Sequence, residues 1–575
     1  MIRCLFLALV SSLTGLCATS TSLSAQGAAR FLPRDAIVSF SMFGPRAFGD
    51  RTAETNLGRL LADPAAAPIR ELPAKMLDKI LAEIGDSRAE THLRGAYEFF
   101  GGYGGRISCA ARFAMDADAE NADEALGELL VGIVFEPDGE TDFAAFVESV
   151  REAANDAELE QRLIGTEANG FTLVQGENRK QFVLPRVIDG HLVCYYGLGL
   201  EDALARLGEQ SSGEEPAADE SLLHLRVELD RLMGIVISSL AGIGGRSEIE
   251  PELLEVIDRR IGLKQFDLRF RTDGEFLRAD YSIVADPERS ILDLLQPNAK
   301  STPIAALAPS DHENWSSVRL DLGWILNFAR DLVMEARGED VFELLEQVSS
   351  EFGVDVRHDL FGAFDGQLLL LNDSLAGLEA MAEGDEDEDA EVAGLYSGVI
   401  GLRDAKAFES TLEKLLRSRG LHAARKTTEY RGVAIRTMNV AIVQFSYAIV
   451  NEGIAFGVGK IGVDSVRSIV DASLAATDGQ RQIRFPEPFA ERRRRIGDDW
   501  RDFQISSSAG YAGILKDVMA GELEDLDDPV GFAVVNDIVM PALEAWLELA
   551  PRFDLERSLS AMRLVPGRLE IVSIQ

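Results

Sequence analysis

The sequence predicts an α+β protein made of two tandem homologous modules, each a mainly antiparallel sheet with helices packed on it. Three observations support this prediction. Alternating apolar segments are joined by short turns, amphipathic helical segments lie between them, and the same order of elements returns about 262 residues later. Hydrophobic residues make up 46% of the 575 residues, which excludes a disordered chain and supplies enough apolar side chains for a core.

Residues 1–25 are predicted to be a secretory signal peptide, because a single arginine precedes an apolar run at residues 4–10 and small residues follow it. Cleavage at Ala18 or Ala28 is an alternative. A large residue precedes Cys17, where a lipoprotein signal needs a small one. No later stretch reaches the ~18–20 apolar residues that a membrane-spanning helix needs. We therefore expect a soluble exported protein, periplasmic or extracellular, without a membrane span.

The first module is predicted to span residues 30–300. The segment that starts at Phe143 carries apolar residues at i, i+3, i+4 and i+7, which is one face of a helix. Asp189 followed by Gly190 is a two-residue hairpin signal. In chain order, the expected elements are a strand at 36–42, helices ending near Gly85, a strand from Gly104, a strand at 128–135, a helix from 142, a strand at 168–174, hairpin arms at 182–187 and 191–196, a helix at 200–207, and a closing hairpin at 266–270 and 276–284.

The second module is predicted to span residues 301–575, after a turn-rich junction at 296–302. Its expected elements are a strand at 317–320, helices ending near Gly353, a strand at 398–402, a helix around Phe408, a strand at 430–435, a hairpin turning at 451–453, a helix from 463, and a closing hairpin at 560–564 and 569–574. Phe146 and Phe408 are 262 residues apart, and four pairs of glycines keep an offset of 261–263. Independent elements would not keep one register over some ninety residues, so we infer an internal duplication.

The charge limits the class of partner. The chain carries 96 acidic and 57 basic residues, for a formal net charge of −39. A polyanion would be repelled, so we expect no nucleic-acid partner. Anionic membrane surfaces are disfavoured for the same reason.

No pattern in the sequence identifies a catalytic, cofactor-binding or metal-binding residue, and we predict no cofactor. The nucleophile elbow Gly-x-Ser-x-Gly and the patterns His-Glu-x-x-His and Cys-x-x-Cys are absent, and the glycines at 457–459 lack the serine or threonine of a phosphate-binding loop. None of the six histidines has a recognisable partner: His92, His191, His224, His312, His358 and His422. The sequence therefore favours a protein that is not an enzyme, without deciding the question.

Two cysteines, Cys109 and Cys194, remain after the predicted signal peptide. Export permits a disulfide, but a bridge needs Cα atoms within about 7 Å of each other. Two buried free thiols are the favoured interpretation, and the disulfide is the alternative.

Three charged runs stand out. Acidic runs at 116–124 and 383–391 fall at the same point of the repeat. Calcium takes oxygen ligands of this kind, but the spacing of a calcium-binding loop is missing, so solvated connectors are favoured. Four arginines at 492–495 stand beside Glu491, Asp498 and Asp499. We expect them to pair with these carboxylates on a helix or loop, and an anionic glycan or acidic partner is the alternative.

Two segments of the chain resemble those of a known group of proteins. The residues Leu32, Pro33, Arg34 and Asp35 follow the predicted signal peptide, and a glycine-led strand begins at Gly104 and Gly105. Together with the strand–helix–hairpin–helix order, they make the chain similar to exported bacterial proteins of a domain-of-unknown-function family. The resemblance implies export and an α+β architecture, and it implies no activity, substrate or site residue.

The favoured functional hypothesis is a non-catalytic exported binding or scaffold protein of the cell envelope. Its partner would be an unknown component of the envelope or the extracellular space. Two alternatives remain. One is a carrier of an apolar ligand held between sheet and helices. The other is a hydrolase with a carboxylate site that the sequence does not reveal.

Overall fold

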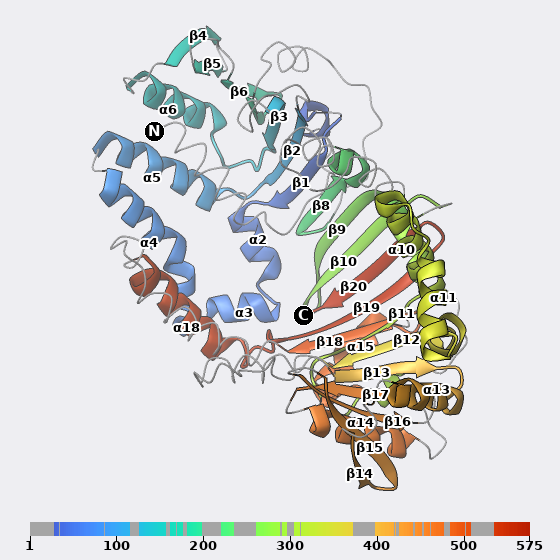
Figure 1. Ribbon diagram of the computed structural model, residues 1–575. Coiled ribbons are helices and arrows are strands. Elements are labelled where there is room, and N and C mark those ends of the chain that lie inside the picture. Colours follow the sequence, from blue (N-terminus) through green and yellow to red (C-terminus); the bar gives the residue numbers. More distant parts are fainter. Residues whose placement is uncertain are drawn as a thin grey trace. The chain divides into compact units, whose positions relative to one another are not determined.

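The computed structural model describes residues 28–575 with gaps at 34, 85–86, 116–125, 157–160, 168–169, 176–180, 198–219, 235–259, 288–289, 296–303, 311, 372–396, 419, 421–424, 441–442, 451–452, 460–461, 477–482, 501 and 508–533 (Figure 1). The predicted signal peptide, the helix at 200–207 and both acidic runs lie outside the described residues. The chain forms two compact units. Unit 1 holds residues 1–251, 263–284 and 533–549, and unit 2 holds residues 252–262, 285–532 and 550–575.

Unit 1 is built on ten described strands, paired in the order β4-β5-β6-β7-β3-β2-β1-β8-β9-β10. The strands are β1 (Val38–Phe43), β2 (Arg106–Met115), β3 (Leu126–Phe135), β4 (Gln161–Glu167), β5 (Gly170–Gln175), β6 (Gln181–Ile188), β7 (His191–Gly197), β8 (Leu223–Glu228), β9 (Leu263–Asp273) and β10 (Phe276–Ala285). The helices are η1 (Ala28–Phe31), α2 (Pro45–Thr52), α3 (Asn56–Ala62), η2 (Pro64–Ala66), α4 (Ala67–Ile84), α5 (Ser87–Gly102), α6 (Phe143–Asp156), η9 (Val535–Val539) and α18 (Met540–Leu549).

Unit 2 repeats this plan with its own ten described strands, in the order β14-β15-β16-β17-β13-β12-β11-β18-β19-β20. The strands are β11 (Trp315–Arg319), β12 (Phe364–Leu371), β13 (Ser397–Leu402), β14 (Lys426–Tyr430), β15 (Val433–Val440), β16 (Val443–Val450), β17 (Gly453–Val458), β18 (Asp502–Ser507), β19 (Arg557–Val565) and β20 (Arg568–Ile574). The helices are η3 (Ile291–Leu294), η4 (Ile304–Leu307), α10 (Leu322–Arg337), α11 (Val341–Phe352), η5 (Val356–Leu360), η6 (Phe361–Ala363), α13 (Ala405–Ser418), α14 (Gly462–Ala476), η8 (Glu487–Phe489) and α15 (Ala490–Ile496).

The α+β class, with antiparallel sheets and helices, is confirmed. The turn signal at 189–190 forms the β6–β7 hairpin, and Asp189 and Gly190 both have positive φ, at 50° and 79°. Strand β14 is missing from the sequence prediction, because four of its five residues are exposed and no apolar alternation marks it. The division into modules at 296–302 stays a prediction. Helix α18 belongs to unit 1 although β18 and β19, which flank it in the sequence, belong to unit 2.

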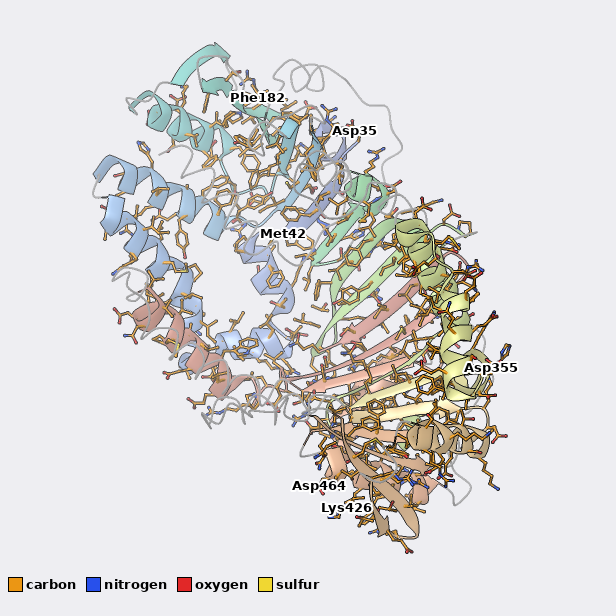
Figure 2. All side chains as sticks on the ribbon, in the orientation of Figure 1. Asp35, Met42, Phe182, Asp355, Lys426 and Asp464 are labelled. Carbon is orange, nitrogen blue, oxygen red and sulfur yellow. The ribbon has the colours of Figure 1, made fainter. Side chains whose placement is uncertain are left out.

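Two apolar clusters lie on the sheet of unit 1, and Figure 2 labels one member of each, Met42 and Phe182. The cluster of Met42 joins the sheet to α5 and α6 through Tyr103, Phe143 and other aromatic side chains. The cluster of Phe182 is covered by η1, and the Tyr195 hydroxyl donates to the Phe31 carbonyl there. Each fully buried aromatic side chain of this size stabilises the fold by about 1.5–3 kcal/mol.

In unit 2, a third cluster joins α13 to the sheet, and its members include Phe408, Leu416 and Tyr447. Helix α14 packs on β13, β16 and β17. Within the residues that the structure describes, no helix is both long and apolar enough to cross a lipid bilayer.

Candidate binding groove

A groove of about 420 Å³ lies in unit 2 between helix α11 and the π-helical turn η5. Its apolar lining comes from Phe342, Leu345 and Val354. The rest of the lining is Gly353 and polar or charged residues: Glu346, Ser349, Ser350, Asp355, Arg357, His358 and Asp359. Asp355 is labelled in Figure 2. The groove therefore combines an apolar surface with carboxylates.

Helix α11 forms one wall of the groove. Both of its ends are capped, and the helix is amphipathic. The Asp340 carboxylate caps the first turn by accepting from the Phe342 N–H at 2.8 Å. Phe342, Leu345 and Phe352 recur at helical spacing on one face. Gly353 ends the helix in the left-handed conformation, with φ 65°, and its N–H donates to the Ser349 carbonyl.

The turn η5 forms the other wall, and Asp355 holds it. The Asp355 carboxylate accepts from the His358 N–H at 2.9 Å and lies 2.8 Å from His358 Nδ1. These two contacts, the backbone one first, lower the pKa of Asp355. Ser349 ties the walls together, because its hydroxyl accepts from the Val356 N–H at 3.0 Å and donates to the Leu345 carbonyl at 2.6 Å. The two walls of the groove are thus joined by hydrogen bonds within the chain.

The Phe342 ring is already occupied by cations. The guanidinium of Arg357 lies 4.0 Å from the ring centroid, and that of Arg330 in α10 lies 5.3 Å from it. Both distances suit a cation–π contact. A ligand would therefore meet the aliphatic groups of Leu345 and Val354 more readily than the aromatic face.

The groove segment is strongly acidic. Residues 339–359 contain seven Asp and Glu, one Arg and no Lys. Among the described residues, the Glu346 carboxylate has no ion-pair partner. Glu351 lies near the end of α11, where the helix dipole disfavours an anion, and the last turn of that helix holds no basic residue. Asp340 and Asp355 have structural roles at the start of α11 and in η5, whereas Glu346 makes no ion pair in the described part of the chain.

A second polar cluster lies in unit 1, where the side chain of His224 is buried. Its Nε2 is 2.9 Å from a carboxylate oxygen of Asp267, and Asp267 also accepts from the Arg269 Nε–H at 3.1 Å. Burial raises the pKa of Asp267, but the hydrogen bond and charge of His224 and the charges of Arg269 and Arg226 outweigh it, so the pKa is lowered. Together these residues form a charge network, in which Arg269 Nε also lies 2.8 Å from His224 Nε2.

Ser41 lies opposite His224 in the β1–β8 pair, so a serine, a histidine and an aspartate come from adjacent strands. The Ser41 side chain is 0% exposed and His224 is 4% exposed. A nucleophile has to reach its substrate. This arrangement therefore argues against a hydrolase centre at these three residues.

The structure places the two cysteines on β2 and β7, and both lie opposite Ile133 of the intervening strand β3. Two strand spacings separate Cys109 from Cys194, roughly 10 Å, which exceeds the reach of a disulfide. Both thiols are free, as favoured, but both side chains are half-buried and not fully buried. Burial raises the pKa of Cys194 to about 12, which keeps the thiol protonated at neutral pH.

The arginine run forms helix α15, and its expected pairing with nearby carboxylates is confirmed for three members. Arg494 and Arg495 pair with Glu491, and Arg493 pairs with Asp498. Arg492 behaves differently. It is fully buried and bonds Asp554, a partner that local sequence could not indicate.

Sequence reasoning missed the groove. Of the six histidines only His358 lines it, and His422 lies outside the described residues. The available signal was the acidic excess beside an amphipathic helix at 341–352. Within the described ranges, no group of three or more His, Cys, Asp or Glu gathers around a possible metal position. No family model, curated protein or solved structure matches the chain.

Proposed function

We propose that this chain is an exported, non-catalytic binding protein of the cell envelope, and that it holds its partner in the groove between α11 and η5. The observation that carries the proposal is the groove itself, with walls held by internal hydrogen bonds, an aliphatic lining and the Glu346 carboxylate, which makes no ion pair among the described residues. None of the residues of α11 is fully buried, and Leu344 and Val348, which lie on this helix outside the groove lining, are more than a third exposed. Exposed apolar residues beside charges are typical of an interaction surface.

The proposal includes two modules derived by duplication. Strand β1 pairs with β2 and β8, as β11 pairs with β12 and β18. The other pairs follow the same correspondence in both units. This agreement, together with the sequence offset of about 262 residues, supports a common origin. Export is supported by the features of residues 1–25.

Binding is favoured over catalysis because the groove is open to water. The His358 side chain is 75% exposed and its carboxylate partner Asp355 is more than half exposed. A catalytic pair gains strength when water is excluded, which this position does not offer. The same exposure suits reversible recognition of a partner at the protein surface.

The test is capture of partners from an envelope extract by the mature protein and two variants. Ser350→Arg places a long side chain in the groove at an exposed position. Ala82→Arg makes a matched change at an exposed position of α4 in unit 1. We expect a set of captured components that Ser350→Arg loses and Ala82→Arg keeps. Equal capture by both variants, or none by the wild type, would contradict the proposal.

A further inference from the structure

We infer that the groove binds a short cationic segment of a partner protein, in which a Lys or Arg side chain lies next to an aliphatic one. The inference rests on the proposed function and adds the chemistry of the ligand. It is argued from the charges, the apolar lining and the fixed geometry of the two walls.

The charges indicate a cation. Each wall carries one carboxylate that can accept further hydrogen bonds or pair with a cation. Glu346 on α11 has no ion-pair partner among the described residues, and on η5 the Asp359 carboxylate accepts only from the Asp355 N–H, at 3.2 Å. The carboxylate of Asp355 itself is engaged by His358. A ligand ammonium or guanidinium between the walls would therefore meet Glu346 and Asp359.

The apolar lining indicates an aliphatic group beside that cation. Leu345 and Val354 line the groove, and two arginines already cover Phe342. A ligand cation gains little at a ring that two guanidinium groups share, since like charges repel. The ligand's charge therefore goes to the carboxylates, and its aliphatic side chain goes to Leu345 and Val354.

The helix dipole and the net charge act in the same direction. A cation near the end of α11 would interact favourably with the negative end of the helix. A net charge of −39 steers cationic partners toward the protein and repels anionic lipid surfaces. A polyamine would satisfy the carboxylates but would offer only thin methylene chains to the aliphatic lining, whereas a branched leucine side chain covers more of it, so a peptide segment fits better.

The experiment measures binding of labelled hexapeptides to the mature protein by fluorescence anisotropy. The probe is Gly-Lys-Leu-Lys-Leu-Gly, compared with a version carrying Glu for Lys, a version carrying Ser for Leu, and spermidine as competitor. We expect the Lys–Leu peptide to bind best and to weaken as salt rises. Glu346→Gln and Asp359→Asn should each weaken it about 1.5- to 5-fold, as expected for exposed charge pairs.

The matched control is Glu98→Gln, an exposed glutamate on helix α5 of unit 1. It should leave the affinity unchanged, whereas Glu346→Lys should shift preference toward the Glu–Leu peptide. Equal weakening by Glu98→Gln, or full competition by spermidine alone, would overturn the inference. If the wild type instead binds the Glu–Leu peptide or anionic vesicles, and Ser350→Arg abolishes that binding, the inference of a cationic ligand is overturned. The proposed function of the groove would then still stand. If no probe and no captured component responds to Ser350→Arg, both fall.

Discussion

Ser41 of β1 and Ser317 of β11 occupy the same place in two identically paired sets of strands, but their neighbours differ. Ser41 lies opposite His224, whereas the Ser317 hydroxyl accepts from the Phe503 N–H at 3.2 Å. One strand further, Asp267 of unit 1 corresponds to Leu559 of unit 2, by the pairs Arg226–Asp267 and Ile505–Leu559. The same strand order is thus built once with a charged cluster and once with apolar side chains. The sheet itself does not need the cluster.

This comparison predicts that the effects of substituting His224 and Asp267 on the free energy of unfolding do not add. His224→Phe alone removes one hydrogen-bond partner of the Asp267 carboxylate, whose side chain is only 14% exposed, and leaves Arg269 as the other. The free energy of unfolding should therefore fall by about 1–3 kcal/mol. His224→Phe combined with Asp267→Leu copies unit 2 and should recover most of that loss, because no buried charge remains. Urea denaturation of the four proteins measures the coupling. Simple addition of the two single effects would show that the cluster is not a unit.

A second prediction concerns Glu136, which follows β3. Its Oε1 atom is buried, without a hydrogen-bond partner in the described part of the chain. Burial raises the pKa of Glu136 to about 7, although the charge of Arg106 opposes this. Between about pH 4.5 and pH 7 the folded protein therefore keeps a proton that the unfolded chain has lost, so this group lowers stability as pH rises through that window.

Glu136→Gln should remove this contribution. The variant should gain stability relative to the wild type as pH rises from about 4.5 to 7, and the difference should stay constant above and below that range. Thermal unfolding followed by circular dichroism at a series of pH values measures it. Glu98→Gln, at an exposed position, provides the control. A difference that does not change with pH would mean that Glu136 titrates normally.

Short-range patterns in the sequence predicted much of the fold. The apolar face that begins at Phe143 became α6, and the pair Asp189 and Gly190 became a hairpin, because helical period and turn conformation are local properties. The strand at Lys426–Tyr430 was missed because its exposure at the sheet edge removes the apolar alternation. The unit membership of α18 is set by packing with distant residues, which no local pattern records.

The candidate site was predictable only in part. Helix α11 follows from its amphipathic pattern, and the acidic excess is visible in the sequence. The groove depends on the hydrogen bond between Ser349 and the Val356 N–H and on the conformation of η5, which join residues seven positions apart without any periodic signal. For the same reason, His358 had no recognisable partner in the sequence, although Asp355 is three residues away.

A third prediction separates two members of the arginine run. Arg492 is fully buried, and its guanidinium donates to the Asp554 carboxylate at 2.7 Å and to the Asp554 carbonyl at 2.8 Å. Arg492→Ala should cost about 3–5 kcal/mol, since it breaks a buried charge pair. Arg494→Ala should change stability by no more than about 0.5 kcal/mol, because that side chain is 76% exposed. Chemical denaturation compares them, and similar costs would contradict the assigned environments.

A fourth prediction uses two glycines with opposite surroundings. Gly398 in β13 lies against β12, and a Cβ atom there would be 2.1 Å from the Leu369 carbonyl oxygen, whereas a Cβ on Gly95 in α5 would have no neighbour within 4 Å. Gly398→Ala should therefore push the two strands apart and cost about 1–3 kcal/mol or more. Gly95→Ala should stabilise the protein by up to about 1 kcal/mol, because alanine favours the helix. Paired thermal denaturation curves measure both changes. If Gly398→Ala left the stability unchanged, strands β12 and β13 would have room for a Cβ atom at this position, which contradicts the close backbone approach described here.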